Sequence, residues 1–281
     1  MPTLYVSDLD GTLLDTDRKV SPRSVSLLNE AISGGALFSV ATARTPATVS
    51  TLLSGVSCRL PLIVMTGAAI WDRDSNTYLH AAFHSEQAAA RLLDVYRRHR
   101  LSSFIYTLGE DNLLHIYHIG PLSRLERQFI AERIDSPFKT FHIPDNGESE
   151  LPGRLDRVLL FFCMRPTAEV EPVYDEIRSF TDIRPVYYHD MYGDEIALME
   201  VFCPEASKAA AVSRLAAIAG ADRIVAYGDN VNDLPILEIA DDAVAVANAV
   251  DEVKERADRS IGPNSSDAVA QDILRLMKGE K

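Results

Sequence analysis

Cysteine is scarce in this chain: only Cys58, Cys163 and Cys203 occur in 281 residues. They are odd in number, widely spaced and set among apolar residues, so they fit reduced core residues rather than disulfides or a zinc cluster. No apolar run is long enough to cross a bilayer, and residues 1–6 lack the basic start and cleavage site of a signal peptide. We therefore expect a cytoplasmic protein that does not engage a membrane.

Basic residues are also in deficit, because 28 lysines and arginines stand against 41 aspartates and glutamates, for a formal net charge of −13. This balance argues against nucleic acid as a partner, since binding of the phosphate backbone draws on a basic face. It does not exclude a small phosphorylated substrate, because a bound Mg²⁺ and one well-placed lysine can reverse the local field of a site. We expect a monomer or a weak homo-oligomer.

Near-continuous apolar strands alternate with amphipathic helices at both ends of the chain. The expected strands are residues 4–7, 36–41, 61–67, 223–227 and 243–246, and the expected helices are residues 22–32, a helix from about 46, 205–219 and 266–278. Ser21 is expected to cap the first helix, with Pro22 at its first position. The alternation indicates a parallel sheet covered on both faces, in a Rossmann-like, doubly wound α/β core.

The pattern changes character near residue 82. Helices are expected at residues 86–100, 122–134 and 167–180, and strands at 103–107, 113–119, 157–164, 185–189 and 196–202. Adjacent hairpin strands mixed with helices suggest an α+β domain with an antiparallel sheet. We expect residues 1–82 and 203–281 to form the core and residues 83–202 to be an inserted α+β domain.

Two carboxylates follow the first strand, where Asp8 and Asp10 precede a Gly11-Thr12 turn. Alternate side chains of an extended segment share a face, and a strand cannot bury two like charges without a counter-ion. A hard cation such as Mg²⁺ would satisfy both carboxylates. The same Asp-x-Asp-Gly pattern also occurs in calcium loops and in plain surface turns. Leucines at positions 13 and 14 and the β-type run before Asp8 argue against a calcium loop of the EF-hand type.

Polar residues also lie at two later strand ends and at one helix start. Thr42 follows strand 36–41, Lys208 lies early in helix 205–219, and the segment 228–233 follows strand 223–227. In open α/β sheets the ligand crevice lies at the carboxyl ends of the strands, so these residues are expected to converge on one site. With residues 8–12, and in this order, they resemble the haloacid dehalogenase (HAD) superfamily. The position of the insertion resembles that of its Cof-like phosphatases with a type IIB cap, and the resemblance covers essentially the whole chain.

This resemblance implies a Mg²⁺-dependent phosphatase that forms an aspartyl-phosphate intermediate, with residues 83–202 as a cap domain for substrate specificity. Asp8 matches the nucleophile, and Asp10 matches the general acid that then acts as a base toward water. Mg²⁺ would be held by Asp8, the backbone carbonyl of Asp10 and Asp229. Asp233 would support the metal shell, directly or through water.

The phosphoryl group would be held by a second set of residues, namely Leu9, Thr42, Ala43, Lys208 and Asn232. Thr42 offers a hydroxyl and Ala43 a backbone N–H at a strand-to-helix turn, where amides point outward and the helix dipole favours anions. Lys208 is expected to contact both the phosphoryl group and Asp8. The plain alternatives are a solvated helix lysine for Lys208 and an ordinary turn-forming role for Asn232.

Three motifs depart from the family pattern. The usual Thr-Gly-Arg is Thr42-Ala43-Arg44, so this turn must tolerate a Cβ and avoid positive φ. The usual Asn-Gly-Ala after the third strand begins with Thr66, which removes an amide, and the usual Ala-Met-Gly-Asn-Ala is Ala-Val-Ala-Asn-Ala at residues 245–249. These changes leave the expected chemistry intact and loosen any statement about the substrate.

The expected cap carries aromatic and histidine residues that could bind a sugar or could simply pack in a sheet: Tyr106, His115, Tyr117, His118, Tyr187, Tyr188 and His189. Their spacing gives no metal-site signature. The leading hypothesis is hydrolysis of a small phosphorylated metabolite, most plausibly a sugar phosphate. The competing hypotheses are a phosphomutase or phosphotransferase, in which another hydroxyl replaces water, and a catalytically silent protein that binds a phosphometabolite.

Overall fold

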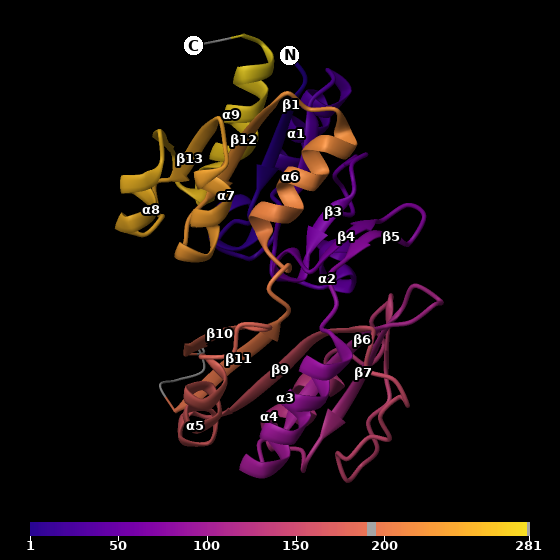
Figure 1. Cartoon of the computed structure of the whole chain (residues 1–281). Coiled ribbons are helices and arrows are strands. Elements are labelled where there is room, and N and C mark those ends of the chain that lie inside the picture. Colours follow the sequence, from indigo (N-terminus) through magenta and orange to yellow (C-terminus); the bar gives the residue numbers. More distant parts are fainter. Residues whose placement is uncertain (190–194, 280–281) are drawn as a thin grey trace. The chain divides into compact units, whose positions relative to one another are not determined.

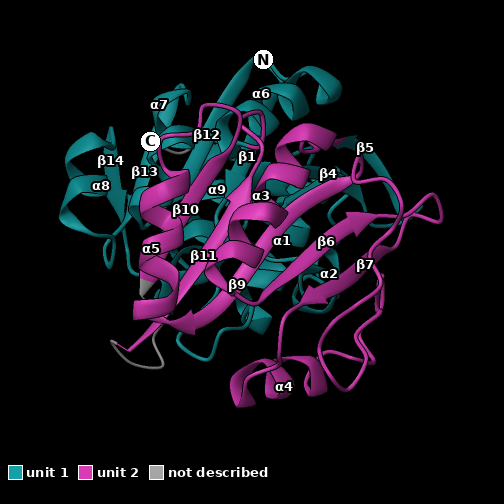
Figure 2. Ribbon diagram, turned by 60° about the horizontal axis from the view of Figure 1, so that its bottom comes forward, with its two compact units in different colours: residues 1–80, 207–281 teal, residues 81–206 magenta. Residues whose placement is uncertain are grey.

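The computed structural model of the chain describes residues 1–189 and 195–279 and divides into two compact units. Unit 1 comprises residues 1–80 and 207–281, and unit 2 comprises residues 81–206 (Figure 2). Unit 2 is therefore one continuous insertion in the sequence of unit 1. The expected fold class, a doubly wound α/β core with an inserted α+β domain, is confirmed.

The main sheet of unit 1 is entirely parallel. Its strands are β1 (Thr3–Ser7), β2 (Leu37–Val40), β12 (Arg223–Gly228), β13 (Asp242–Val246) and β14 (Arg259–Ile261), in the order β14-β13-β12-β1-β2. β1 lies between β2 and β12, with Leu4 opposite Leu37 on one side and Ile224 on the other. The two ends of the chain thus form one sheet (Figure 1). This pairing brings the carboxyl ends of β1, β2 and β12 to the same edge.

Six helices accompany this sheet within the described residues. They are α1 (Pro22–Ser33), α2 (Pro46–Leu52), α6 (Lys208–Ala219), α7 (Leu234–Glu238), α8 (Asp251–Arg256) and α9 (Ala268–Met277). Ser21 caps α1 as expected, its hydroxyl accepting a hydrogen bond from the amide of Ser24. α6 begins at Lys208 rather than at residue 205. No helix among the described residues is long and apolar enough to span a membrane.

The third expected strand does not extend the parallel sheet. β3 (Leu62–Val64) joins β4 (Ala69–Asp72) and β5 (Thr77–Ala81) in a separate three-stranded sheet, and β3 pairs with β4 antiparallel. β3 is linked to the end of β2 by an isolated parallel bridge between Ala41 and Ile63 and by a hydrogen bond from the Ser39 hydroxyl to the Pro61 carbonyl. The prediction that this strand belongs to the main parallel sheet was wrong because the chain reverses direction at residues 65–67, immediately after β3. The returning strand, β4, is too short to show an alternating hydrophobic pattern in the sequence.

Unit 2 is built on a six-stranded sheet in the order β10-β11-β9-β6-β7-β8. Its strands are β6 (Ser103–Leu108), β7 (Leu114–Ile119), β8 (Lys139–Phe141), β9 (Val158–Pro166), β10 (Arg184–His189) and β11 (Ile196–Phe202), and its helices are α3 (Glu86–His99), α4 (Arg124–Ala131) and α5 (Thr167–Ile177). All pairs are antiparallel except β7 with β8. Buried side chains of α3 and α5 pack with residues such as Ile105 and Phe161 to form the core.

Candidate active site

Strand β1 delivers Asp8 to the carboxyl edge of the main sheet. The Asp8 amide donates a hydrogen bond to the carbonyl of Tyr227 in the neighbouring β12 at 3.0 Å, so Asp8 continues the register of the sheet. The chain then turns through residues 9–13, and Asp8 itself is only 5 % exposed. A carboxylate this buried needs charged or hydrogen-bonding partners nearby.

Lys208, the first residue of α6, supplies one partner. Its Nζ lies 2.6 Å from Asp8 Oδ1 and 2.7 Å from Asp233 Oδ1, and both lysine and Asp233 are essentially inaccessible. The second oxygen of Asp233 accepts hydrogen bonds from the amides of Asp229 and Asn230, which fixes the loop after β12. The structure therefore buries Lys208 at the strand ends, and the alternative of a solvated helix lysine is wrong.

Asp229 completes a cluster of three carboxylates. One oxygen each from Asp8, Asp229 and Asp233 lie within 4.8 Å of one another, which makes this the one group of three potential metal-ligating side chains among the described residues. The Thr12 hydroxyl donates a hydrogen bond to Asp229 Oδ1 at 2.8 Å and so orients that carboxylate. Three carboxylates face one ammonium, so the ionised cluster holds two negative charges in excess.

The electrostatics of the cluster follow from this imbalance. Burial raises the pKa of Asp8, and the charges of Asp233 and Asp229 add to the rise, although Lys208 opposes it. Burial likewise raises the pKa of Asp229 to about 6. Burial alone would lower the pKa of Lys208, but Asp8 and Asp233 outweigh it and raise that pKa. The site is thus deficient in positive charge, which an additional cation would correct.

Asp10 lies outside this cluster. Its carboxylate is half exposed and accepts a bidentate pair from Arg44, with distances of 2.7 Å to Nε and 2.6 Å to Nη2. Arg44 follows β2, in the segment where the sequence placed Thr42 and Ala43. The pairing of Arg44 with Asp10 was not predicted from the sequence. The arginine of the Thr-x-Arg motif was the available signal.

Glycine is required at one position of the first turn. Gly11 has φ +80°, and a Cβ there would lie 2.3 Å from Asp229 Oδ2. The Gly11 carbonyl accepts a hydrogen bond from the side-chain amide of Asn248 at 2.7 Å. Asn248 lies in the Ala-Val-Ala-Asn-Ala segment noted in the sequence, so this motif residue tethers the turn that follows Asp8.

The residues expected to hold a phosphoryl group lie in different surroundings. Thr42 is buried, and its hydroxyl accepts a hydrogen bond from the amide of Arg44 at 3.2 Å. Ala43 is exposed and has no positive φ, as its Cβ demands. Leu9 has a fully buried side chain, so only its backbone is available to a ligand. Asn232 is exposed, one residue before buried Asp233.

Thr66, at the end of β3, adopts φ +56° and ψ +30°, a left-handed conformation that is strained for a β-branched residue. Its amide donates to the carbonyl of Thr42 at 2.9 Å, while its buried hydroxyl has no hydrogen-bond partner. The family asparagine that the sequence lacks here would tolerate this backbone. The substitution thus stores strain beside Thr42.

The aromatic and histidine residues expected in the insertion have separate roles in unit 2. His118 is fully buried, and its Nδ1 lies 2.8 Å from the carbonyl oxygen of Gly147, so it is a core residue. Tyr187 stacks on Tyr174 within the core side of the sheet. Tyr106 is buried, Tyr188 is exposed, and the side chain of His189 lies outside the described residues.

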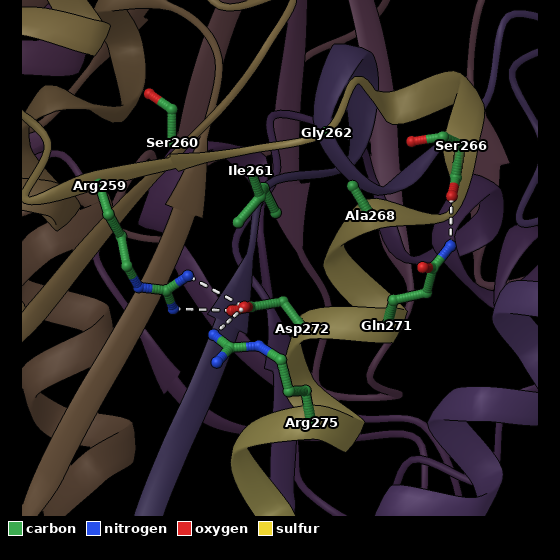
Figure 3. Close-up of a pocket in the computed structure, with 9 residues that line it drawn as sticks. All are labelled: Arg259, Ser260, Ile261, Gly262, Ser266, Ala268, Gln271, Asp272 and Arg275. Carbon is green, nitrogen blue, oxygen red and sulfur yellow. Dashed lines mark hydrogen bonds and ion pairs between the residues drawn. The ribbon is translucent and has the colours of Figure 1, made fainter. Parts of the chain in front are cut away.

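The pocket shown in Figure 3 lies elsewhere in unit 1. It has a volume of about 610 Å³ and is lined by residues of β14 and α9 and the segment between them, and none of the expected site residues lines it. Asp272, one of the lining residues, accepts hydrogen bonds from Arg259 and Arg275 and, at 2.9 Å, from the hydroxyl of Tyr227. Because Asp272 is buried and ion-paired with both arginines, we interpret this group as structural.

The chain is similar in sequence and in fold to known hydrolases. A family model described as haloacid dehalogenase-like hydrolase matches residues 5–273. The chain is 23 % identical to the pyridoxal phosphate phosphatase YbhA of Escherichia coli, with 95 % of each protein covered. It is also 23 % identical to the 5-amino-6-(5-phospho-D-ribitylamino)uracil phosphatase YwtE of Bacillus subtilis, with 97 % of each covered. Among solved structures, a haloacid dehalogenase-like hydrolase from Bacteroides thetaiotaomicron superposes with a TM-score of 0.78 at 22 % identity, over 98 % of this chain and all of that one.

Proposed function

The chain belongs to the haloacid dehalogenase-like hydrolases, and from that membership we propose that it is a Mg²⁺-dependent phosphatase that acts on a small phosphorylated metabolite through an aspartyl-phosphate intermediate. The observation that carries this proposal is the buried contact between Lys208 and Asp8 beside Asp229 and Asp233. A buried carboxylate held by one ammonium and short of positive charge is suited to receive both a cation and a phosphoryl group.

The donor set fits Mg²⁺. The side-chain ligands of the cluster are all carboxylate oxygens, which hard divalent cations prefer, and the excess negative charge of the cluster matches a dication. Asp8 and Asp229 would hold the ion, with the backbone of Asp10 as expected from the family. Mg²⁺ would neutralise negative charge on the phosphoryl oxygens during transfer of the phosphoryl group.

Asp233 is better suited to positioning than to direct metal binding. One of its oxygens is taken by Lys208, and the other accepts the amides of Asp229 and Asn230. It therefore holds the ammonium and the metal-binding loop in place. This separates its role from that of Asp229, whose carboxylate accepts a hydrogen bond from the Thr12 hydroxyl alone among the residues that the structure describes.

Asp8 is the nucleophile in this account. Its carboxylate oxygen attacks phosphorus, and the bond from phosphorus to the leaving-group oxygen breaks, giving an acyl phosphate on Asp8 and an alkoxide that takes a proton from Asp10. Asp10 then removes a proton from water, which attacks phosphorus and frees Asp8 together with inorganic phosphate. Lys208 stabilises the negative charge near Asp8 throughout.

Arg44 is a positioning residue for this proton transfer. Its planar guanidinium donates hydrogen bonds to both oxygens of Asp10 and thereby limits where that carboxyl group points. Because this pairing favours the ionised carboxylate, one of the two hydrogen bonds opens when Asp10 carries the proton. Thr42, through its hydroxyl, and Ala43 and Leu9, through backbone N–H groups, are proposed to bind phosphoryl oxygens, with Asn232 reaching the same group. The turn after β2 thus serves both the phosphate and the acid.

The substrate class is proposed to be sugar phosphates. The curated relatives named above act on pyridoxal phosphate and on a phosphorylated ribitylamino uracil, which are also small phosphomonoesters. Unit 2, as an insertion of the kind that caps such enzymes, is proposed to carry the residues that distinguish these leaving groups.

The test is release of inorganic phosphate from para-nitrophenyl phosphate, followed by a panel of sugar phosphates, pyridoxal phosphate and phosphorylated ribityl compounds. We expect turnover with Mg²⁺, loss of turnover in EDTA, and loss of turnover in Asp8→Asn. Asp17→Asn is the matched control, because Asp17 is an exposed carboxylate of the same segment. Near-normal turnover by Asp8→Asn would refute the nucleophile assignment, and a phosphorylated acceptor in place of free phosphate would refute simple hydrolysis.

A further inference from the structure

The turn that follows β13, residues 247–250, is hydrogen-bonded to two loops of the carboxylate cluster in unit 1. The side-chain amide of Asn248 donates to the carbonyl of Gly11 at 2.7 Å, in the turn after β1. Two residues later along the chain, the amide of Val250 donates to the carbonyl of Asp229 at 2.9 Å. One short turn thus holds the backbone of both segments that are expected to bind Mg²⁺.

A second asparagine holds the first one in place. Asn248 Oδ1 accepts a hydrogen bond from the backbone amide of Asn264 at 2.9 Å, so both ends of the Asn248 carboxamide are hydrogen-bonded. The side-chain amide of Asn264 in turn donates to the carbonyl of Leu14 at 2.7 Å. The turn of residues 9–14 is therefore held at two carbonyls, those of Gly11 and Leu14, by side chains from the C-terminal part of unit 1.

Gly11 is the residue at which this turn can change conformation most easily. It has φ +80°, and glycine adopts positive and negative φ about equally readily. Its carbonyl is the acceptor for Asn248, so that hydrogen bond fixes the peptide plane between Gly11 and Thr12. The Thr12 hydroxyl donates to Asp229 Oδ1, and Asp10 directly precedes the glycine. The conformation at Gly11 therefore determines how both of its neighbours are oriented.

We propose that Asn248, supported by Asn264, is a positioning residue for Mg²⁺ binding. It holds Gly11 so that the backbone of Asp10 and the carboxylate of Asp229 are available to one ion. This inference rests on the proposed function, since it takes Mg²⁺ as the ion of the cluster. Without the Asn248 side chain the turn samples other conformations, and the apparent dissociation constant for Mg²⁺ rises in inverse proportion to the fraction of molecules that keep the binding-competent one.

The chain contains an asparagine with the same bonding pattern whose partners lie outside the loops of the cluster. Asn29, on α1, donates its side-chain amide to the carbonyl of Gly55 at 2.9 Å and accepts the amide of Ser57 at 2.8 Å. Like Asn248, it joins two other segments through both ends of one carboxamide. Replacing either asparagine by alanine removes the same two hydrogen bonds, so both changes should lower stability to a similar extent. Mg²⁺ affinity distinguishes a positioning role from a structural one.

The test is calorimetric titration of the full chain with magnesium chloride in the absence of substrate. Asn248→Ala should raise the dissociation constant for Mg²⁺ about three- to tenfold, the equivalent of one hydrogen bond. Asn264→Ala should raise it less, because the backbone amide that Asn248 accepts is retained. Asn29→Ala is the matched control and should bind Mg²⁺ as wild type does. Urea unfolding in EDTA should show similar losses of stability for Asn248→Ala and Asn29→Ala.

Turnover of para-nitrophenyl phosphate provides a second measurement. Bound Mg²⁺ restores the competent conformation, so kcat of Asn248→Ala should approach that of wild type once Mg²⁺ is raised by the same factor as its dissociation constant. Equal Mg²⁺ affinity in wild type and Asn248→Ala, or equal weakening in Asn29→Ala, would overturn the positioning role and leave the proposed function intact. Failure of wild type to bind Mg²⁺ would overturn both.

Discussion

Lys208 Nζ lies 2.6 Å from Asp8 Oδ1 although the two residues stand 200 positions apart in the sequence. The contact forms because β1 pairs with β12 and α6 begins beside the end of β1, so both halves of unit 1 contribute to one buried ion pair. Lys208 is also the only cation that contacts Asp8 or Asp233 among the described residues. Its charge should therefore matter to both stability and turnover.

Replacing Lys208 by methionine should lower turnover of para-nitrophenyl phosphate by about 10²–10³-fold, the usual loss on removing one group that stabilises transition-state charge. It should also destabilise the chain by about 3–5 kcal/mol in EDTA, because two buried carboxylates lose their partner. Initial rates and urea unfolding measure the two effects. Lys254→Met, which removes a partly exposed lysine, should change neither. A Lys208→Met variant as stable as wild type in EDTA would contradict the buried pairing.

Thr66→Asn should stabilise the chain by about 1 kcal/mol, because asparagine tolerates the left-handed backbone that threonine adopts there at a cost. The measurement is the midpoint of urea unfolding. Thr48→Asn makes the same exchange within α2, where the backbone is right-handed, and should give no gain. A loss of stability on Thr66→Asn would show that the methyl group of Thr66 packs better than its backbone strain costs.

His84 should make the stability of the chain depend on pH. Burial lowers the pKa of His84 to about 4, although its Nε2 lies 3.0 Å from the Val201 carbonyl and that contact acts in the opposite direction. An unfolded histidine titrates near 6.5, so between about pH 6.5 and 4 the unfolded state binds a proton that the folded state does not. This contribution to stability is complete above about pH 6.5 and is lost as the pH falls, by about 3 kcal/mol in total.

The measurement for His84 is urea unfolding of wild type and His84→Gln at pH 7.5 and pH 5. Glutamine has no proton to gain in this range, so the variant should lose less stability than wild type as the pH falls. Carboxylates elsewhere contribute equally to both proteins and cancel in the difference. Parallel stability curves for the two proteins would show that His84 is protonated at the same pH in both states.

The elements with a clear hydrophobic pattern were predicted correctly from the sequence. The parallel core followed from apolar strands alternating with helices, and the convergence of Asp8, Lys208 and Asp233 followed from the rule that such strands end at a common edge. Strands β4, β5, β8 and β14 were not predicted. β5, β8 and β14 lack the continuous apolar run that marked strands as short as β2, and β4 follows β3 too closely to stand out as a separate strand. The antiparallel turn after β3 likewise depends on tertiary contacts such as the hydrogen bond between Thr66 and Thr42.

The partners of individual side chains were harder to predict. Arg44 binds Asp10, Thr12 binds Asp229 and Asn248 binds Gly11, and each pairing depends on rotamers and on loop paths that spacing does not encode. The hydrogen bond between His142 and His115 in unit 2 is a similar case, since it needs a parallel strand of only three residues. Sequence patterns therefore identified the chemistry-bearing residues more readily than the contacts that orient them.

We propose that Asp8 carries the phosphoryl group, and acid quenching of the Asp10→Asn variant during turnover of para-nitrophenyl phosphate traps that intermediate. This leaving group needs little protonation, so the first step should proceed while hydrolysis of the acyl phosphate, which needs Asp10 as base, slows by about 10²–10⁴-fold. Peptide mapping by mass spectrometry should then find one phosphoryl group per chain, on the peptide that contains Asp8. Phosphate release by this variant with no phosphorylated peptide, or with the label on another residue, would contradict the account.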